Sequence, residues 1–238
     1  MSNKAVLIIH GFMADKNEVE YLLNTIKNNS NIDVYSFTLP GHDSNILKDV
    51  KFEEWIDYSQ EMLNNLKPKY KKIYLVGHSM GGVIATHLAT VNKEVEKLVL
   101  VAPSFIYLEL TENMDIVKEK FKNTKRNKEK YKEVAEKIFT SSISSIIEFK
   151  KLVKKYYDTP KEVKCNTLII HGEKDLVVPI KSSVYVYENI NNKDKHLKIV
   201  KGADHSLLYE YKKEYVSKYI CNYLKGGLLW IITKNLKI

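Results

Sequence analysis

The chain has 238 residues and a mass of 27.7 kDa, a length that fits one large domain or two small ones. Hydrophobic residues make up 44% of it, which is enough for a folded core and excludes a disordered or collagen-like protein. The net charge of +9 would suit contact with nucleic acid or an anionic membrane. However, much of the excess comes from the Lys-rich stretch 118–137, which we interpret as a solvated helical face rather than as a nucleic-acid site.

The cysteines and the apolar runs indicate a cytoplasmic protein. Cys165 and Cys221 lie far apart without C-x-x-C spacing, as expected of buried thiols in a reducing compartment. The apolar run near the N-terminus is too short for a signal peptide. No apolar run approaches the length of a transmembrane helix, so we expect no membrane span.

Six short runs rich in aliphatic and β-branched residues predict strands. Most are continuously apolar, which is typical of strands buried on both faces of a parallel sheet. The predicted strands, in chain order, are 5–10, 33–37, 72–76, 97–102, 167–171 and 197–200. Amphipathic stretches between them predict helices at 17–28, 53–66, 82–91, 181–190 and 208–224. This alternation indicates a three-layer α/β fold, with a mostly parallel sheet covered by helices on both faces.

Two segments depart from this alternation of strands and helices. Residues 104–160 contain helical patterns and no strand, and are too long for a loop, so they predict a helical cap inserted between core segments 1–103 and 161–225. Gly226 and Gly227 should end the last helix, leaving the apolar tail 226–238. That tail could dock on the core, fray, pair with another subunit or make peripheral contact with a membrane surface.

A G-x-S-x-G pentapeptide, residues 77–81, carries the strongest chemical signal. It directly follows a predicted strand and directly precedes a predicted helix, the context of a nucleophile elbow. In such an elbow Ser79 occupies a strained turn, so its close neighbours must lack a Cβ. An ordinary Gly-rich strand-to-helix turn is the alternative, and the context argues against it.

A serine nucleophile needs a base and an acid that orients the base. Among seven histidines, His205 is the best base because it follows the last strand, at the edge where parallel sheets bind ligands. His196 lies at the opposite end of that strand, His87 lies inside a helix, and His78 should point away from Ser79. Asp175, in the turn after the fifth strand, is the first choice for the acid, followed by Glu173 and then Asp204.

The remaining predicted site residues bind the substrate. The backbone N–H groups of Met80 and Phe12 are the candidate oxyanion donors, since each follows a strand end near Ser79. The side chains expected to contact substrate are those of Phe12, Met80, Phe105 and Val177. Apolar residues of the cap indicate either an apolar acyl pocket or the packing of the cap itself.

Five motifs in this order resemble those of the α/β-hydrolase superfamily, and within it small bacterial carboxylesterases and monoacylglycerol lipases with a short helical cap. They are HGF (10–12), LPGHD (39–43), GHSMGG (77–82), HGEKDLVVP (171–179) and GADHS (202–206). The resemblance implies a triad of Ser79, Asp175 and His205, with Phe12 and Met80 as oxyanion donors. It also implies ester hydrolysis through an acyl-enzyme on Ser79, without a metal or organic cofactor. If the apolar cap residues line an acyl pocket, they indicate carboxylic esters of short to medium chains or monoacylglycerols.

Other activities share such a site. Thioester hydrolysis, C–C bond hydrolysis and a proline-type aminopeptidase remain alternatives, although an aminopeptidase needs carboxylates near a cap that here is basic. A dehalogenase would need Asp in place of Ser79. A non-catalytic ligand-binding protein of the same fold is a further alternative, because fold alone does not determine function.

Overall fold

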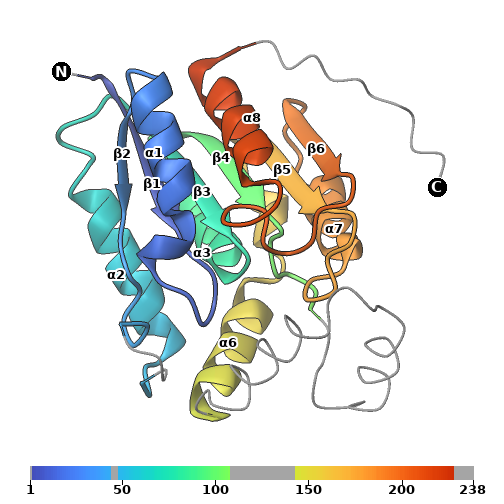
Figure 1. Ribbon diagram of the computed structural model, residues 1–238. Helices are drawn as coiled ribbons and strands as arrows, with labels where there is room; N and C mark the ends of the chain where they lie inside the picture. Colours follow the sequence, from blue (N-terminus) through green and yellow to red (C-terminus); the bar gives the residue numbers. More distant parts are fainter. Residues whose placement is uncertain (1, 44–47, 108–142, 228–238) are drawn as a thin grey trace.

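The computed structural model describes residues 2–43, 48–107 and 143–227, and they form a six-stranded parallel sheet between two layers of helices (Figure 1). The strand order is β2-β1-β3-β4-β5-β6. The strands are β1 (Lys4–Ile9), β2 (Asp33–Ser36), β3 (Lys72–His78), β4 (Val95–Val101), β5 (Asn166–Gly172) and β6 (Lys195–Val200). All six predicted strands are confirmed, and the α/β fold class with them.

The four central strands are apolar because both of their faces are buried. Successive side chains of β1 point to opposite faces, so Ala5, Leu7 and Ile9 join one core cluster while Val6 and Ile8 join the other. The edge strand β2 alternates between exposed and half-buried residues, because successive side chains point to opposite faces and Val34 packs on one of the two cores. The sheet therefore separates two hydrophobic cores, each closed by its own helices.

The helices divide between the two faces (Figure 1). α1 (Glu20–Asn29), which follows the short 3-10 helix η1 (Lys16–Val19), packs with α8 (Lys213–Lys225) on one face. α2 (Phe52–Asn64), α3 (Met80–Val91) and α7 (Ile180–Asn189) cover the other. No helix within the described ranges is long and apolar enough to cross a bilayer.

The predicted start of the last helix is wrong. The sequence pattern places it at residue 208, whereas α8 begins at Lys213. Between them the chain forms turns, in which the N–H groups of Tyr209 and Glu210 both donate to the carbonyl of Ser206. The C-terminal end agrees with the prediction, because Gly226 ends α8 in the left-handed conformation with φ 83°.

One helix of the predicted cap lies within the described residues. α6 (Ile143–Tyr156) packs on α2 and α3 through the buried side chains of Leu152 and Val153. The backbone N–H of Phe52 donates to the Glu148 carboxylate at 3.1 Å, which links the start of α2 to α6. The short helix η2 (Thr159–Glu162) follows α6 and leads into β5. Residues 108–142, with the Lys-rich stretch, and the tail from residue 228 lie outside the described residues.

Candidate active site

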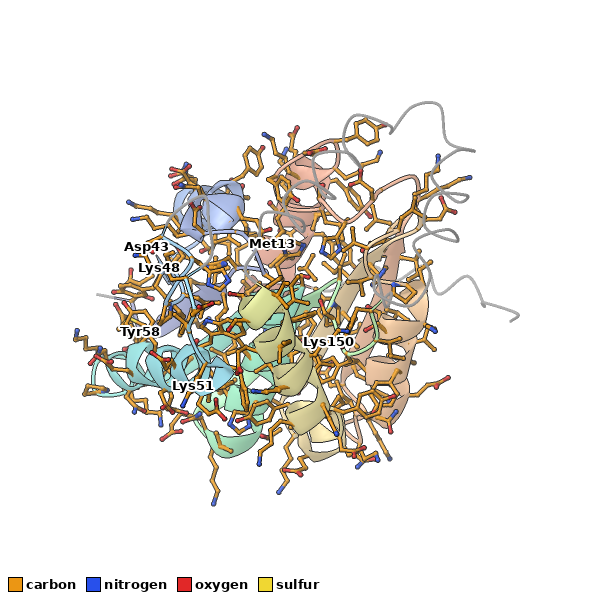
Figure 2. All side chains as sticks on the ribbon, turned by 90° about the horizontal axis from the view of Figure 1, so that it is seen from below. Met13, Asp43, Lys48, Lys51, Tyr58 and Lys150 are labelled. Carbon is orange, nitrogen blue, oxygen red and sulfur yellow. The ribbon has the colours of Figure 1, made fainter. Side chains whose placement is uncertain are left out.

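The parallel sheet places three predicted residues at one edge. β3 ends at His78 and is followed by Ser79, β5 ends at Gly172 shortly before Asp175, and β6 ends at Val200 shortly before His205. Because all strands run in the same direction, their carboxyl ends meet at this edge. Figure 2 views the molecule from this end, with α6 crossing in front and Met13 of the loop after β1 labelled behind it.

Ser79 occupies a strained turn between β3 and α3. Its backbone has φ 52° and ψ −116°, and Met80 begins α3 immediately afterwards. A Cβ on Gly77 would collide with the backbone of Gly81, and a Cβ on Gly81 would collide with the carbonyl of Ile9. Only glycine fits at either position, so these glycines let the elbow rest directly on β1.

The structure brings Ser79, His205 and Asp175 into one hydrogen-bonded chain. Ser79 Oγ lies 3.1 Å from His205 Nε2, and His205 Nδ1 lies 2.7 Å from Asp175 Oδ2. The other carboxylate oxygen, Asp175 Oδ1, accepts the backbone N–H groups of Val177 and Val178, both at 2.9 Å. These contacts fix the direction of the carboxylate toward the imidazole.

Electrostatics keep the Asp175 carboxyl ionised although it is buried. Burial alone would raise its pKa, but the charge and hydrogen bond of His205 oppose this, aided by His171 and the N–H of Val178, and the net pKa is lowered. An ionised Asp175 accepts a hydrogen bond from the Nδ1–H of His205, which leaves Nε2 without a proton and free to accept the hydroxyl proton of Ser79. That is the orientation in which an imidazole acts as a base.

The histidines set aside in the sequence analysis have other partners than Ser79. His78 turns its Nδ1 toward Glu18. His87 stacks on the ring of Tyr156, and His196 lies beside Asp194 at the start of β6.

The second- and third-choice acids contact backbone groups. Glu173 accepts the N–H of Gly202 at 2.9 Å, and Asp204 accepts the N–H of Ser206 at 2.9 Å. Neither carboxylate takes the position beside the His205 ring that Asp175 holds.

Two backbone N–H groups are available near Ser79. Met80 is the first residue of α3, so its N–H has no intrahelical carbonyl to bond. The N–H of Phe12 has no hydrogen-bond partner within the described parts of the chain. The peptide that carries this N–H is held by His10, whose Nδ1 lies 2.7 Å from the carbonyl oxygen of Gly11 while its Nε2 accepts the N–H of Leu39.

Aromatic rings surround the Phe12 side chain. Phe12 stacks on Phe149 of α6 with ring centroids 5.2 Å apart, and Trp55 and His42 meet it edge-on. Burial lowers the pKa of His42 to about 4, so that ring is neutral.

The two remaining predicted contact residues are less clearly placed. Phe105 is fully buried in the core cluster beneath this edge, whereas Val177 is half-buried in the Asp175 loop. Their contact with substrate stays a prediction.

The sequence analysis missed two residues of this region. Ser104 Oγ lies 2.9 Å from Ser79 Oγ, and Glu18 lies 2.9 Å from His78. Ser104 follows β4 in a turn without a carboxylate, and it belongs to none of the five motifs. Its place after a strand end next to β3 is the signal that could have found it. Within the described ranges, no group of three or more His, Cys, Asp or Glu residues is arranged to hold a metal ion.

Comparison with known proteins identifies the family. The family model described as serine aminopeptidase, S33, matches residues 2–212. A protein of Mycoplasma pneumoniae named as an esterase/lipase is 25% identical over 241 aligned positions, which cover 91% of this chain and 88% of that protein.

Two solved structures share the fold. A metagenome-derived lipolytic enzyme superposes with a TM-score of 0.75 at 15% identity, covering 95% of both chains. The monoacylglycerol lipase of Paleococcus ferrophilus superposes with a TM-score of 0.73 at 19% identity, covering 93% of this chain and 94% of the other. Since the family match includes the elbow, the acid turn and the base turn, the chain belongs to the S33 serine aminopeptidase family of α/β hydrolases.

Proposed function

We propose that this chain is a serine hydrolase that cleaves carboxylic esters through an acyl-enzyme on Ser79. The observation that carries the proposal is the hydrogen-bonded chain from Asp175 through His205 to Ser79, set in a strained elbow. The esterase/lipase names of the Mycoplasma relatives support the same reaction class.

Acylation begins when Ser79 Oγ attacks the ester carbonyl and its proton passes to His205 Nε2, 3.1 Å away. The negative charge that develops on the carbonyl oxygen is stabilised by the N–H groups of Phe12 and Met80. His205 is then an imidazolium, which the ionised Asp175 stabilises. When the tetrahedral intermediate collapses, the C–O bond breaks and His205 gives its proton to the leaving alcohol.

Deacylation repeats the sequence with water as the nucleophile. His205 Nε2 takes a proton from the water, which attacks the acyl carbonyl, and the same two N–H groups stabilise the oxyanion. Collapse releases the carboxylic acid and returns the proton to Ser79. This chain therefore supplies the nucleophile, the base and the oxyanion donors from its own residues.

The aromatic surroundings of Phe12 favour an apolar acyl group. Phe12 lies next to the proposed oxyanion donor and stacks on Phe149, which also contacts the ring of Tyr107. Such rings suit a short to medium acyl chain, and the glyceryl esters of monoacylglycerol lipases belong to that class. The free thiols of Cys165 and Cys221 favour a reducing compartment, and we infer a cytoplasmic location.

Hydrolysis of p-nitrophenyl esters, from acetate to laurate, tests the proposal. We expect the wild type to turn over, and Ser79→Ala to lose several orders of magnitude in kcat. Ser144→Ala is a matched control, because Ser144 is an exposed serine on α6. An inactive wild type, or an active Ser79→Ala variant, would overturn the proposal. Parallel assays with aminoacyl p-nitroanilides and acyl thioesters distinguish the aminopeptidase and thioesterase alternatives.

A further inference from the structure

A second carboxylate–histidine pair lies directly behind the proposed triad. His78 is the last residue of β3 and adjoins Ser79, and its side chain is 1% exposed. Its Nδ1 lies 2.9 Å from Oε2 of Glu18, whose side chain is 11% exposed. Its Nε2 lies 3.1 Å from the backbone carbonyl oxygen of His205. Neither of these two contacts is part of the hydrogen-bonded chain from Asp175 to Ser79.

The partners of the His78 ring determine its protonation. Nδ1 faces a carboxylate oxygen and Nε2 faces a carbonyl oxygen, and neither of these atoms can donate a proton. Both contacts are favourable only if both ring nitrogens carry hydrogen, that is, if His78 is an imidazolium. The Nδ1–Oε2 contact lacks good hydrogen-bond geometry, so it holds mainly through charge.

The pKa shifts point the same way. Burial lowers the pKa of His78, but the negative charge of Glu18 beside Nδ1 and the hydrogen bond to the carbonyl of His205 oppose this, and the net pKa is raised. Burial raises the pKa of Glu18, yet the opposing effects of His78 and of the Gly11 N–H bring it to about 2. Both shifts therefore favour the ionised form of the pair.

The same carboxylate oxygen also holds the loop after β1. Glu18 Oε2 accepts the backbone N–H of Gly11 at 2.7 Å, and the next residue is Phe12, the proposed oxyanion donor. A Cβ on Gly11 would lie only 3.2 Å from the Cβ of Ser79 and 3.3 Å from His78 Nδ1, so these segments are closely packed. Glu18 and His78 thus connect the oxyanion loop, the nucleophile elbow and the loop of the base.

Given the proposed function, we propose that Glu18 and His78 form a positioning pair, in which Glu18 keeps His78 as an imidazolium whose Nε2–H holds the backbone of His205 in place. The base can then maintain its distance to Ser79 through acylation and deacylation. Neither residue touches the reacting atoms, so their effect passes through His205 and Phe12.

Other titratable groups surround the His78 ring from several elements. The His205 ring lies 4.9 Å away and that of Tyr209 lies 6.4 Å away, measured between ring centroids. Further charged or titratable neighbours that interact with His78 are His10 after β1, Asp175 after β5 and His171 on β5. Glu18, from η1, is the group that forms the ion pair with His78.

Glu18→Gln removes the negative charge of this side chain while nearly keeping its size and shape. In the wild type one oxygen contacts both the Gly11 N–H and His78 Nδ1. With a neutral amide, His78 loses its counter-ion and keeps a single ring proton. If that proton is on Nδ1, Nε2 presents a lone pair to the His205 carbonyl; if it is on Nε2, Nδ1 presents a lone pair to the amide oxygen. Either tautomer breaks one contact.

The first experiment measures the protonation of the histidine ring nitrogens by nitrogen NMR of the full chain. At about pH 7.5, where an ordinary histidine is mostly neutral, we expect both nitrogens of His78 to be protonated. The His78→Gln variant identifies the resonances. In Glu18→Gln we expect His78 to become neutral and the His205 signals to shift, whereas Glu20→Gln, which removes an exposed charge two residues away, should change neither. A neutral His78 ring in the wild type overturns the proposal, even if Glu18→Gln does not fold.

The second experiment is a double-mutant cycle in ester hydrolysis. We expect Glu18→Gln and His78→Gln each to lower kcat about 10- to 100-fold, with KM changed less than about threefold, and the double variant to be no worse than either single one. The proposed pair is overturned if the kcat losses of the two single variants multiply in the double variant. It is also overturned if Glu18→Gln has the same kcat as Glu20→Gln. Ser79→Ala is assayed alongside. If the wild type has no esterase activity the proposed function fails, while the NMR result still decides the protonation of the pair.

Discussion

The hydroxyl of Ser104 lies 2.9 Å from the hydroxyl of Ser79, and both side chains are buried at the carboxyl edge of the sheet. The backbone repeats this link, because the N–H of Ser104 donates to the carbonyl of Ser79 at 3.2 Å. If Ser79 donates its proton to His205, as the proposed mechanism requires, then Ser104 is the donor of the pair. It thus fixes the rotamer of the nucleophile and contributes a hydrogen bond to the oxygen that gives up its proton during attack.

Ser104→Ala should therefore lower kcat while leaving KM nearly unchanged. A neutral hydrogen bond contributes about 0.5–1.5 kcal/mol, so we expect a loss of about 2- to 10-fold. Steady-state kinetics on p-nitrophenyl butyrate measure this, with the exposed Ser144→Ala as the control. An unchanged kcat would show that the Ser104 hydroxyl does not assist Ser79.

Asp175→Asn should nearly abolish turnover. The amide could still accept the N–H groups of Val177 and Val178 but would no longer stabilise a charged His205, and it would favour the wrong imidazole tautomer. We expect kcat to fall by about 10³- to 10⁴-fold, by analogy with triads in general. Glu173→Gln, in the same turn, is the matched control and should keep activity within about threefold, because the exposed Glu173 carboxylate accepts the Gly202 N–H, a bond that the amide oxygen can also accept. The reverse ranking would make Glu173 the acid.

The strands and the proposed triad could be predicted because their signals are local. A buried parallel strand is continuously apolar, and Ser79 and Asp175 closely follow such strands. His205 closely follows the edge strand β6, whose β-branched and aliphatic residues still indicate a strand. Glu18 gave no such signal, since its contact with His78 depends on how η1 returns across the end of β3. The start of α8 was missed because Leu207 and Leu208 continue the apolar pattern, although their burial occurs in turns. The spacing of apolar residues indicates which residues are buried, and at Leu207 and Leu208 the buried residues lie in turns rather than in a helix.

The ionised Glu18–His78 pair should make stability depend on pH at both ends of the range. Glu18 has a pKa of about 2 when folded and an ordinary value of 4.5, so its contribution is complete above about pH 4.5 and is lost as pH falls toward 2. His78 has a raised pKa, so its contribution is complete below its ordinary value of 6.5 and is lost as pH rises through the folded value. The pair therefore stabilises the fold most between about pH 4.5 and 6.5.

Urea unfolding of the wild type and Glu18→Gln at about pH 3, 5.5 and 8.5 checks this expectation. The difference in free energy of unfolding between the two proteins should be largest at the middle pH and smaller at both extremes. Glu20→Gln should show a small difference that varies little with pH, since Glu20 is exposed. A difference between wild type and Glu18→Gln that is constant across the three pH values would contradict an ion pair between Glu18 and His78.

The stack of Phe149 on Phe12 should set the preferred acyl length. Phe12 belongs to the proposed oxyanion loop and Phe149 to α6, and their rings lie 5.2 Å apart at an interplanar angle of 17°. Phe149→Ala removes one wall and an aromatic contact of about 0.5–1.5 kcal/mol, which both enlarges the space beside Phe12 and loosens the loop. We expect KM for p-nitrophenyl butyrate to rise about 3- to 10-fold, and the chain-length optimum to move toward longer esters.

Ile147→Ala provides the comparison, because Ile147 lies on the same helix but is 47% exposed. It should leave both the KM and the chain-length profile of p-nitrophenyl esters unchanged, since its side chain is not part of the aromatic group around Phe12. If Phe149→Ala keeps the wild-type chain-length profile, the acyl group does not bind against this stack. Phe12 would then act through its backbone N–H alone, and the acyl pocket would have to lie on the other side of Ser79, toward Val177.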